Sequence, residues 1–81
     1  MNSIISSDRL DRLAHLIARD GITAHEAAVG QIARRAAAWG LAPTATAVLA
    51  DRTAPPVARE RAFARVVATL ERERMRAFAA A

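Results

Sequence analysis

The chain contains no cysteine and no tyrosine, and its 81 residues include only two Phe and one Trp. Without cysteine it can form neither a disulfide framework nor a thiolate metal site. The only histidines are His15 and His25, and the position four after His25 is Val29, so no zinc-protease pair is present. Two histidines give no ligand cluster. We therefore expect no metal and no cofactor.

Side chains suited to catalysis are also scarce. The only serines, Ser3, Ser6 and Ser7, lie near the N-terminus and are better explained as a lead-in and a helix cap. No glycine-rich phosphate loop and no pair of carboxylates on an apolar face is present. We expect a non-enzymatic protein without a small-molecule substrate.

Long hydrophobic runs are missing as well. The longest uncharged run, residues 36–50, is too short to cross a bilayer and contains Gly40 and Pro43. The N-terminus lacks the basic-then-apolar pattern of a signal peptide. We expect a cytoplasmic protein with no membrane span.

Large apolar side chains are few for the size of the chain. The hydrophobic fraction is 53%, but 22 of these residues are alanine. A chain of this length forms one domain, and a thin core requires either close helix packing or a second subunit. We expect a lead-in over residues 1–7, a single helical domain over 8–81, and self-association as a homodimer as one way to complete the core.

Helical periodicity is what the sequence does contain. Apolar residues recur at spacings of three and four, no strand-like alternation is present, and glycine or proline separates the periodic segments. The sequence therefore predicts an all-α fold, a small four-helix bundle with three longer helices and one short helix. The expected helices cover residues 8–20, 24–39, 43–51 and 56–78.

The segment 24–39 is expected to be the central helix. Thr23 and Glu26 have the spacing of a capping box, and Gly40 can end the helix in a left-handed conformation. One face of this helix is apolar and includes Trp39, which we expect in the core. A helix that is apolar or small nearly all round is usually buried on more than one side. The opposite face, called here the small-residue face, consists of Ala27, Gly30, Ala37 and Ala38.

The last expected helix carries a row of arginines, called here the Arg row: Arg61, Arg65, Arg72 and Arg76. They fall opposite Phe63 on a helical wheel and form a line about 22 Å long. Arginine binds two phosphate oxygens at once, so the row suits a phosphate backbone, to which Arg34 and Arg52 would add contacts. A solvated face, an acidic protein and a membrane surface remain alternative interpretations.

Two further arginines of this helix, Arg59 and Arg74, lean toward its apolar side. We expect them to extend along the helix toward solvent, or Arg74 to pair with an acid such as Asp20. A structural role is the expectation for both.

Residues 36–41 (AAAWGL) have the small residue, glycine and aliphatic residue of a tight helix–turn–helix corner. Together with residues 43–49 (PTATAVL) and 59–66 (RERAFARV), this segment resembles the DNA-binding headpiece of LacI-type repressors over about 30 residues. The resemblance implies that residues 43–49 form a recognition helix from which Thr44 and Thr46 approach the groove. That helix contains no Arg, Asn or Gln before Arg52 to read a base edge, so DNA contact would be mostly to the backbone. The alternative is an ordinary helical corner.

Two functions follow as hypotheses. The first is a DNA-associated regulator that contacts double-stranded DNA through the Arg row. The second is a protein-interaction or self-associating adaptor module, in which the small-residue face docks another helix or a second copy and the Arg row is only solvated.

Overall fold

The computed structural model describes residues 7–80 and, over that range, contains four α-helices and no strand. The elements are α1 (Ser7–Asp20), the 3₁₀ turn η1 (Ile22–His25), α2 (Glu26–Ala38), α3 (Pro43–Ala50) and α4 (Pro56–Ala80). The predicted all-α bundle of three longer helices and one short helix is confirmed. The expected lead-in lies outside the described residues except for Ser7, which belongs to α1.

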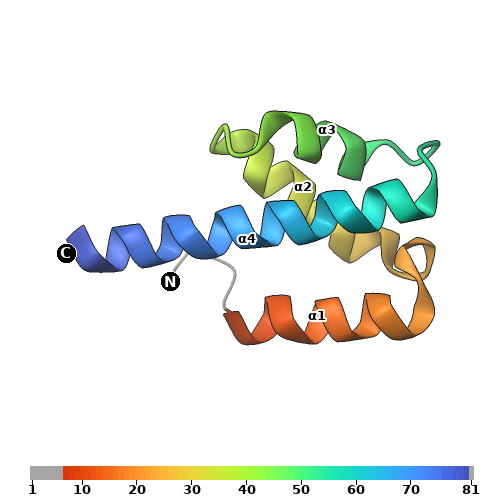
Figure 1. Ribbon diagram of the computed structural model, residues 1–81, viewed down its shortest axis with the longest axis horizontal. Helices are drawn as coiled ribbons and strands as arrows, with labels where there is room; N and C mark the ends of the chain where they lie inside the picture. The colour runs from red at the N-terminus through yellow and green to blue at the C-terminus, as the bar shows by residue number, and fades with distance from the viewer. Residues whose placement is uncertain (1–6, 81) are drawn as a thin grey trace.

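The longest helix sets the shape of the molecule (Figure 1). At 1.5 Å per residue the 25 residues of α4 span about 37 Å, close to the 39 Å long dimension of the chain. α1 runs beside α4 in the opposite direction, and α3 packs against both α4 and α2. The C-terminal turns of α4 extend past the other helices.

The core takes one stripe of side chains from each helix and one residue from η1. Alternation at three and four residues places these side chains on the inner face of each helix. The core is small, as the shortage of large apolar residues indicates. Its members are Leu10, Leu13, Ile17, Ile22, Val29, Ile32, Ala33, Ala36, Leu49, Ala62, Phe63, Val66 and Leu70.

The predicted helix ends at glycine and proline are confirmed. Gly21, at φ 88°, follows α1 and donates its amide to the Ile17 carbonyl at 2.7 Å. After α2, Gly40 has φ 68°, and the amides of Gly40 and Leu41 donate to the carbonyls of Ala37 and Ala36. These two bonds form a Schellman motif. Pro43 is the first residue of α3, where its missing N–H costs nothing.

The capping box predicted at Thr23 is wrong. Thr23 lies inside η1, and α2 begins only at Glu26 with no side-chain cap. The Glu26 carboxylate does not turn back to the backbone, because it accepts two hydrogen bonds from Arg59 of α4.

The prediction that α2 is buried on both sides is also wrong. Ala27, Ala37 and Ala38 are exposed, and Trp39 is 43% exposed rather than in the core. No backbone approaches Gly30, since a Cβ built there would meet only the Arg34 side chain at 3.7 Å. The reason is that α3 covers one flank of α2, whereas α1 packs mainly against η1 and α4.

By helical spacing Ala77 and Phe78 fall on the same side of α4 as Phe63, and Asp20 was one expected partner of Arg74. The structure differs from the sequence pattern at both points. Ala77 and Phe78 continue the apolar stripe of α4 in sequence, yet they are exposed because the helix has passed beyond the bundle at that point. Asp20 pairs with Arg19 and His25, each at 2.8 Å, and not with Arg74. Arg74 lies 3.8 Å from Glu71 on its own helix.

Candidate functional site

The four side chains of the Arg row are exposed along the outward face of α4. The opposite face of the same helix holds Phe63, Val66 and Leu70 in the core. Because burial fixes the rotation of the helix, the row must face solvent. The structure thus brings Arg61, Arg65, Arg72 and Arg76 together on one surface.

The side chains of the Arg row make few hydrogen bonds or ion pairs with the described residues. The side chains of Arg61 and Arg65 make no hydrogen bond or ion pair with any described residue. Arg72 donates to the Thr69 hydroxyl at 3.4 Å, and Arg76 lies 3.1 Å from Glu73 one turn away. Exposed pairs of this kind contribute about 0–1 kcal/mol, so an anion can displace them.

The other predicted phosphate contacts do not join the Arg row. Arg34 lies on the face of α2 that points away from the core, and Arg52 lies 3.7 Å from Glu26. Thr44 is exposed, but Thr46 is only 5% exposed and donates to the Leu41 carbonyl at 3.0 Å. The expectation that Thr46 approaches a DNA groove is therefore wrong, because its hydroxyl is used to hold the start of α3.

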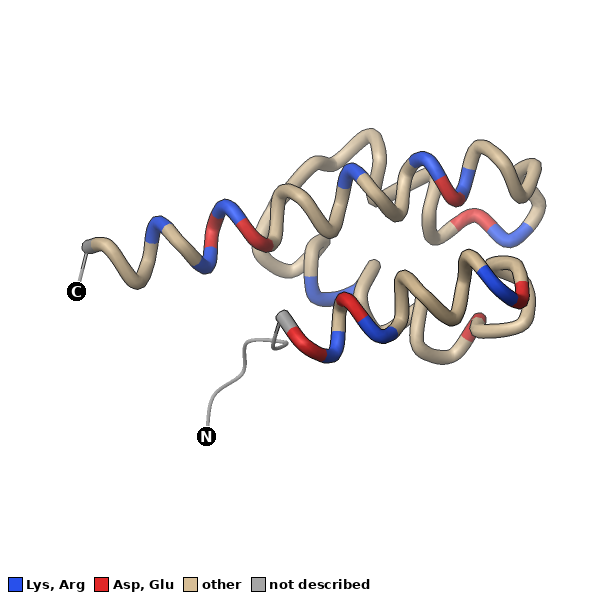
Figure 2. Tube along the Cα trace, turned by 60° about the horizontal axis from the view of Figure 1, so that its bottom comes forward, with Lys and Arg blue, Asp and Glu red and all other residues tan. Residues whose placement is uncertain are grey.

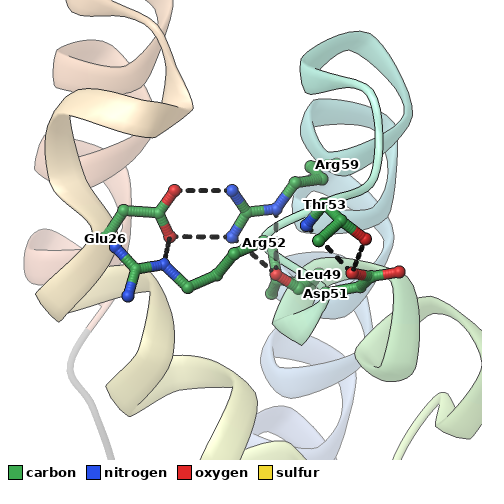
Figure 3. A network of polar contacts seen from close by, with 6 residues as sticks. All are labelled: Glu26, Leu49, Asp51, Arg52, Thr53 and Arg59. Carbon is green, nitrogen blue, oxygen red and sulfur yellow. Dashed lines mark hydrogen bonds and ion pairs between the residues drawn. The ribbon is translucent and has the colours of Figure 1, made fainter.

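Among the described residues Arg59 is the buried charged side chain, and its partners come from two other helices (Figure 3). Its Nη1 and Nη2 donate to the two Glu26 oxygens at 2.6 and 2.9 Å. Its Nε and Nη2 also donate to the Leu49 carbonyl near the end of α3, at 3.2 and 2.9 Å. A helix C-terminus leaves such carbonyls without partners and favours a cation. Arg59 therefore joins α2, α3 and α4.

The charges around Arg59 keep neighbouring carboxyls ionised. Hydrogen bonds from Arg59 lower the pKa of Glu26 against a smaller opposing effect of burial. Hydrogen bonds from the Thr53 hydroxyl and amide lower the pKa of Asp51 in the turn after α3. The donors of Arg59 have partners in Glu26 and Leu49, whereas Arg52 is exposed and lies 3.7 Å from Glu26. We therefore assign Arg59 a structural role.

The small-residue face lines a groove between α2 and α3. Ala27, Gly30 and Ala37 form one wall and Pro43 and Ala47 of α3 face them, around a volume of about 860 Å³. The structure therefore brings most of the small-residue face to one surface, with Ala38 on the other side of α2.

A second groove, between α1 and α2, was not predicted. Its volume is about 710 Å³, and arginines from both helices line it: Arg9, Arg12, Arg34 and Arg35. The sequence signal was the presence of Arg9 and Arg12 one position before Leu10 and Leu13 of the core stripe. That signal becomes a site only once the crossing of α1 and α2 is known.

Within residues 7–80 no three His, Asp or Glu side chains gather closely enough to hold a metal ion. No helix of the described chain combines the length and the apolarity needed to traverse a bilayer. Protein-family models, curated proteins and solved structures contain no match to this chain.

Proposed function

We propose that the protein is a non-enzymatic helical module that binds the phosphate backbone of double-stranded DNA through the Arg row of α4. The observation that carries the proposal is the exposure of four guanidinium groups on one face of one helix, two of them without a partner in the described part of the chain. Guanidinium binds phosphate in a fork geometry and loses little order in doing so. A net charge of +4 supports attraction to a polyanion over a distance.

The proposed binding is largely independent of base sequence. α3 corresponds to the recognition helix implied by the LacI-type resemblance. Its Thr44 hydroxyl is exposed, whereas its Thr46 hydroxyl is buried and bonded to the Leu41 carbonyl. Base readout requires side chains such as Arg, Asn or Gln in the major groove. Contacts to phosphate position a protein on DNA without carrying sequence information.

The test is a salt series of duplex binding followed by fluorescence anisotropy. Four phosphate contacts predict a slope of log K against log salt of about −3 to −4. Arg65→Ala combined with Arg72→Ala should reduce the magnitude of that slope by about 2. The matched control, Arg12→Ala combined with Arg19→Ala, removes the same charge from exposed positions of α1 and should change the slope less.

Equal loss in the two double variants would show that only net charge matters, and the Arg row would then not be the site. Absence of binding to the wild-type protein at low salt would remove the DNA proposal altogether.

The second candidate function is self-association or adaptor binding through the small-residue face. It is favoured by the exposure of Ala27 and Ala37 beside the α2–α3 groove, where nothing within the described chain covers them. Gly30→Leu tests it well, because a Cβ at Gly30 meets only a flexible arginine and the fold should persist. Sedimentation should show a smaller assembly for the variant; an unchanged mass would exclude this face as a self-association surface.

A further inference from the structure

We propose that the groove between α1 and α2, called here the α1–α2 groove, binds an acidic amphipathic helix of another protein. The groove lies on different helices from the Arg row, so the proposal does not rest on DNA binding. Its lining combines four arginines with an apolar floor and Gln31. The lining residues are Arg9, Arg12, Leu13, Leu16, Ala28, Gln31, Ile32, Arg34, Arg35 and Ala38.

The charged side chains that line the α1–α2 groove are all arginines, and the exposed Asp8 and Asp11 of α1 are not among them. Arg9 and Arg12 stand on the α1 side and Arg34 and Arg35 on the α2 side, and no carboxylate is among the lining residues. Figure 2 shows basic positions of α2 close to those at the start of α1. Charges of one sign around a cleft focus their field on what enters it, which favours an anionic partner.

The Arg35 guanidinium has a buried hydrogen-bond donor that is not satisfied within the described chain. The Arg35 side chain is half-buried, and its Nη1 is shielded from solvent without a hydrogen-bond partner among residues 7–80. A desolvated donor without an acceptor is unfavourable, and buried polar groups in native structures are nearly always paired. A carboxylate of a bound partner would supply the acceptor.

The apolar floor of the α1–α2 groove favours an amphipathic helix over a nucleic acid as the partner. Leu16 is half-buried and lies beside Leu13 and Ile32 of the core edge, with Ala28 and Ala38 along α2. The phosphate groups that arginines bind in a nucleic acid offer no apolar stripe to place against this floor. An amphipathic helix has an apolar stripe for the floor and acidic flanks for the rim, which is the geometry of helix-in-groove recognition.

The length of the lining also fits a helix. Its residues on α2 run from Ala28 to Ala38, about 15 Å at 1.5 Å per residue. Two or three turns of a third helix, laid against α1 and α2, would contact the whole floor and all four arginines. Apolar residues at positions i, i+3 or i+4 and i+7 of the partner would face the floor.

The test uses a fluorescein-labelled peptide of about 18 residues, roughly 27 Å as a helix, with Leu at helical spacing and Glu elsewhere. Anisotropy should show saturable binding to the full chain, and circular dichroism should show added helix in the complex. A peptide of the same composition with the Leu stripe scrambled should bind at least tenfold more weakly.

Charge-reversal variants locate the site. Arg12→Glu combined with Arg35→Glu should weaken peptide binding at least tenfold, whereas Arg61→Glu combined with Arg65→Glu on the Arg row should leave it within about twofold. Because Arg35 is half-buried, the exposed pair Arg12→Glu with Arg34→Glu repeats the test in a variant that keeps the fold.

Several results would overturn the proposal. They are equal loss in the groove and Arg-row variants, equal binding of the scrambled peptide, and no binding to the wild-type chain. NMR shifts of groove residues on adding duplex DNA rather than peptide would assign the groove to nucleic acid. A concentration-dependent dimer lost in the groove variants would identify a second copy as the occupant.

Discussion

Arg59 is the largest side chain that the fold buries completely, at 1% exposure, and it bonds to residues of two other helices. Arg59→Ala leaves the Glu26 carboxylate and the Leu49 carbonyl without their main donor. We expect the free energy of unfolding to fall by about 2–4 kcal/mol. Arg61→Ala, two residues along and exposed, is the matched control and should stay within about 0.5 kcal/mol. Urea unfolding of both variants measures the difference, and similar midpoints would show that Arg59 is not a structural tie.

The Glu26 carboxyl makes stability depend on pH. Its pKa is lower in the folded chain than the unfolded value of about 4.3, because Arg59 donates to it. The unfolded state therefore binds a proton first as pH falls, and this contribution, present above about pH 4.3, is lost as pH drops through the folded pKa.

The corresponding measurement compares wild type with Glu26→Gln, which cannot titrate. Wild type should lose more unfolding free energy than the variant between about pH 5 and pH 3. Asp20, whose pKa is lowered to about 2 by hydrogen bonds from Arg19 and then His25, acts in the same direction and is present in both proteins. Parallel pH curves would contradict the role of Glu26.

At the level of single residues, sequence predicted the Arg row and a structural role for Arg59, but not the burial of Arg59 or its partners. The row follows from one helix alone, since its position opposite Phe63 depends only on helical periodicity. Arg59 has its partners 33 and 10 residues away, at Glu26 and Leu49. Nothing local in the sequence distinguishes a buried, paired arginine from one that extends to solvent.

Among the elements, the turn between α2 and α3 contains a strained residue. Ala42 precedes α3 with φ 40° and ψ 59°, a left-handed conformation that costs a residue with a Cβ about 1–2 kcal/mol. Ala42→Gly should raise the free energy of unfolding by about 0.5–1 kcal/mol after the entropic cost of glycine. The control Ala47→Gly, exposed within α3, should lower it by about the same amount. Thermal unfolding separates the two, and a loss in both would argue against strain at Ala42.

The two phenylalanines of α4 test where the bundle ends. Phe63 is in the core and Phe78 is 77% exposed. Phe63→Ala should cost about 3–5 kcal/mol of stability and Phe78→Ala less than about 0.5 kcal/mol. Denaturant unfolding gives both values. A large loss for Phe78→Ala would mean that a second chain or another segment covers the end of α4.

Element boundaries marked by glycine or proline were predictable, because Gly21, Gly40 and Pro43 act through their own backbone geometry. The start of α2 was not. Thr23 and Glu26 have the capping-box spacing, but Arg59 competes for the Glu26 carboxylate, and the segment from Ile22 tightens into a 3₁₀ turn. Tertiary ion pairing overrode the local signal there.

For the molecule as a whole, eight of the twelve arginines lie on two separate surfaces. The Arg row faces outward on α4, while the α1–α2 groove lies between two other helices. If both proposals hold, DNA and the acidic peptide should bind at the same time. We expect the peptide dissociation constant to change less than about threefold when the protein is saturated with duplex, after allowance for repulsion between the two anions. Full competition, measured by anisotropy with unlabelled duplex, would show one shared surface.

The grooves and the exposure of Trp39 could not be predicted from the sequence, because they depend on the relative orientation of α1 and α2. The short connection over residues 21–23 indicated that the two helices are neighbours, but not that α1 would pack on η1 and α4 and leave α2 open. Both grooves and the exposure of Trp39 depend on that geometry.

The free end of α4 has a consequence for dynamics. Its last turns lack the tertiary cover that protects amide hydrogens, so residues 71–79 should exchange with deuterated solvent long before the core does. Arg72 and Arg76 lie on this segment. A polyanion that binds the outward face of α4 would therefore slow deuterium uptake there. Exchange of residues 71–79 would then detect polyanion binding directly.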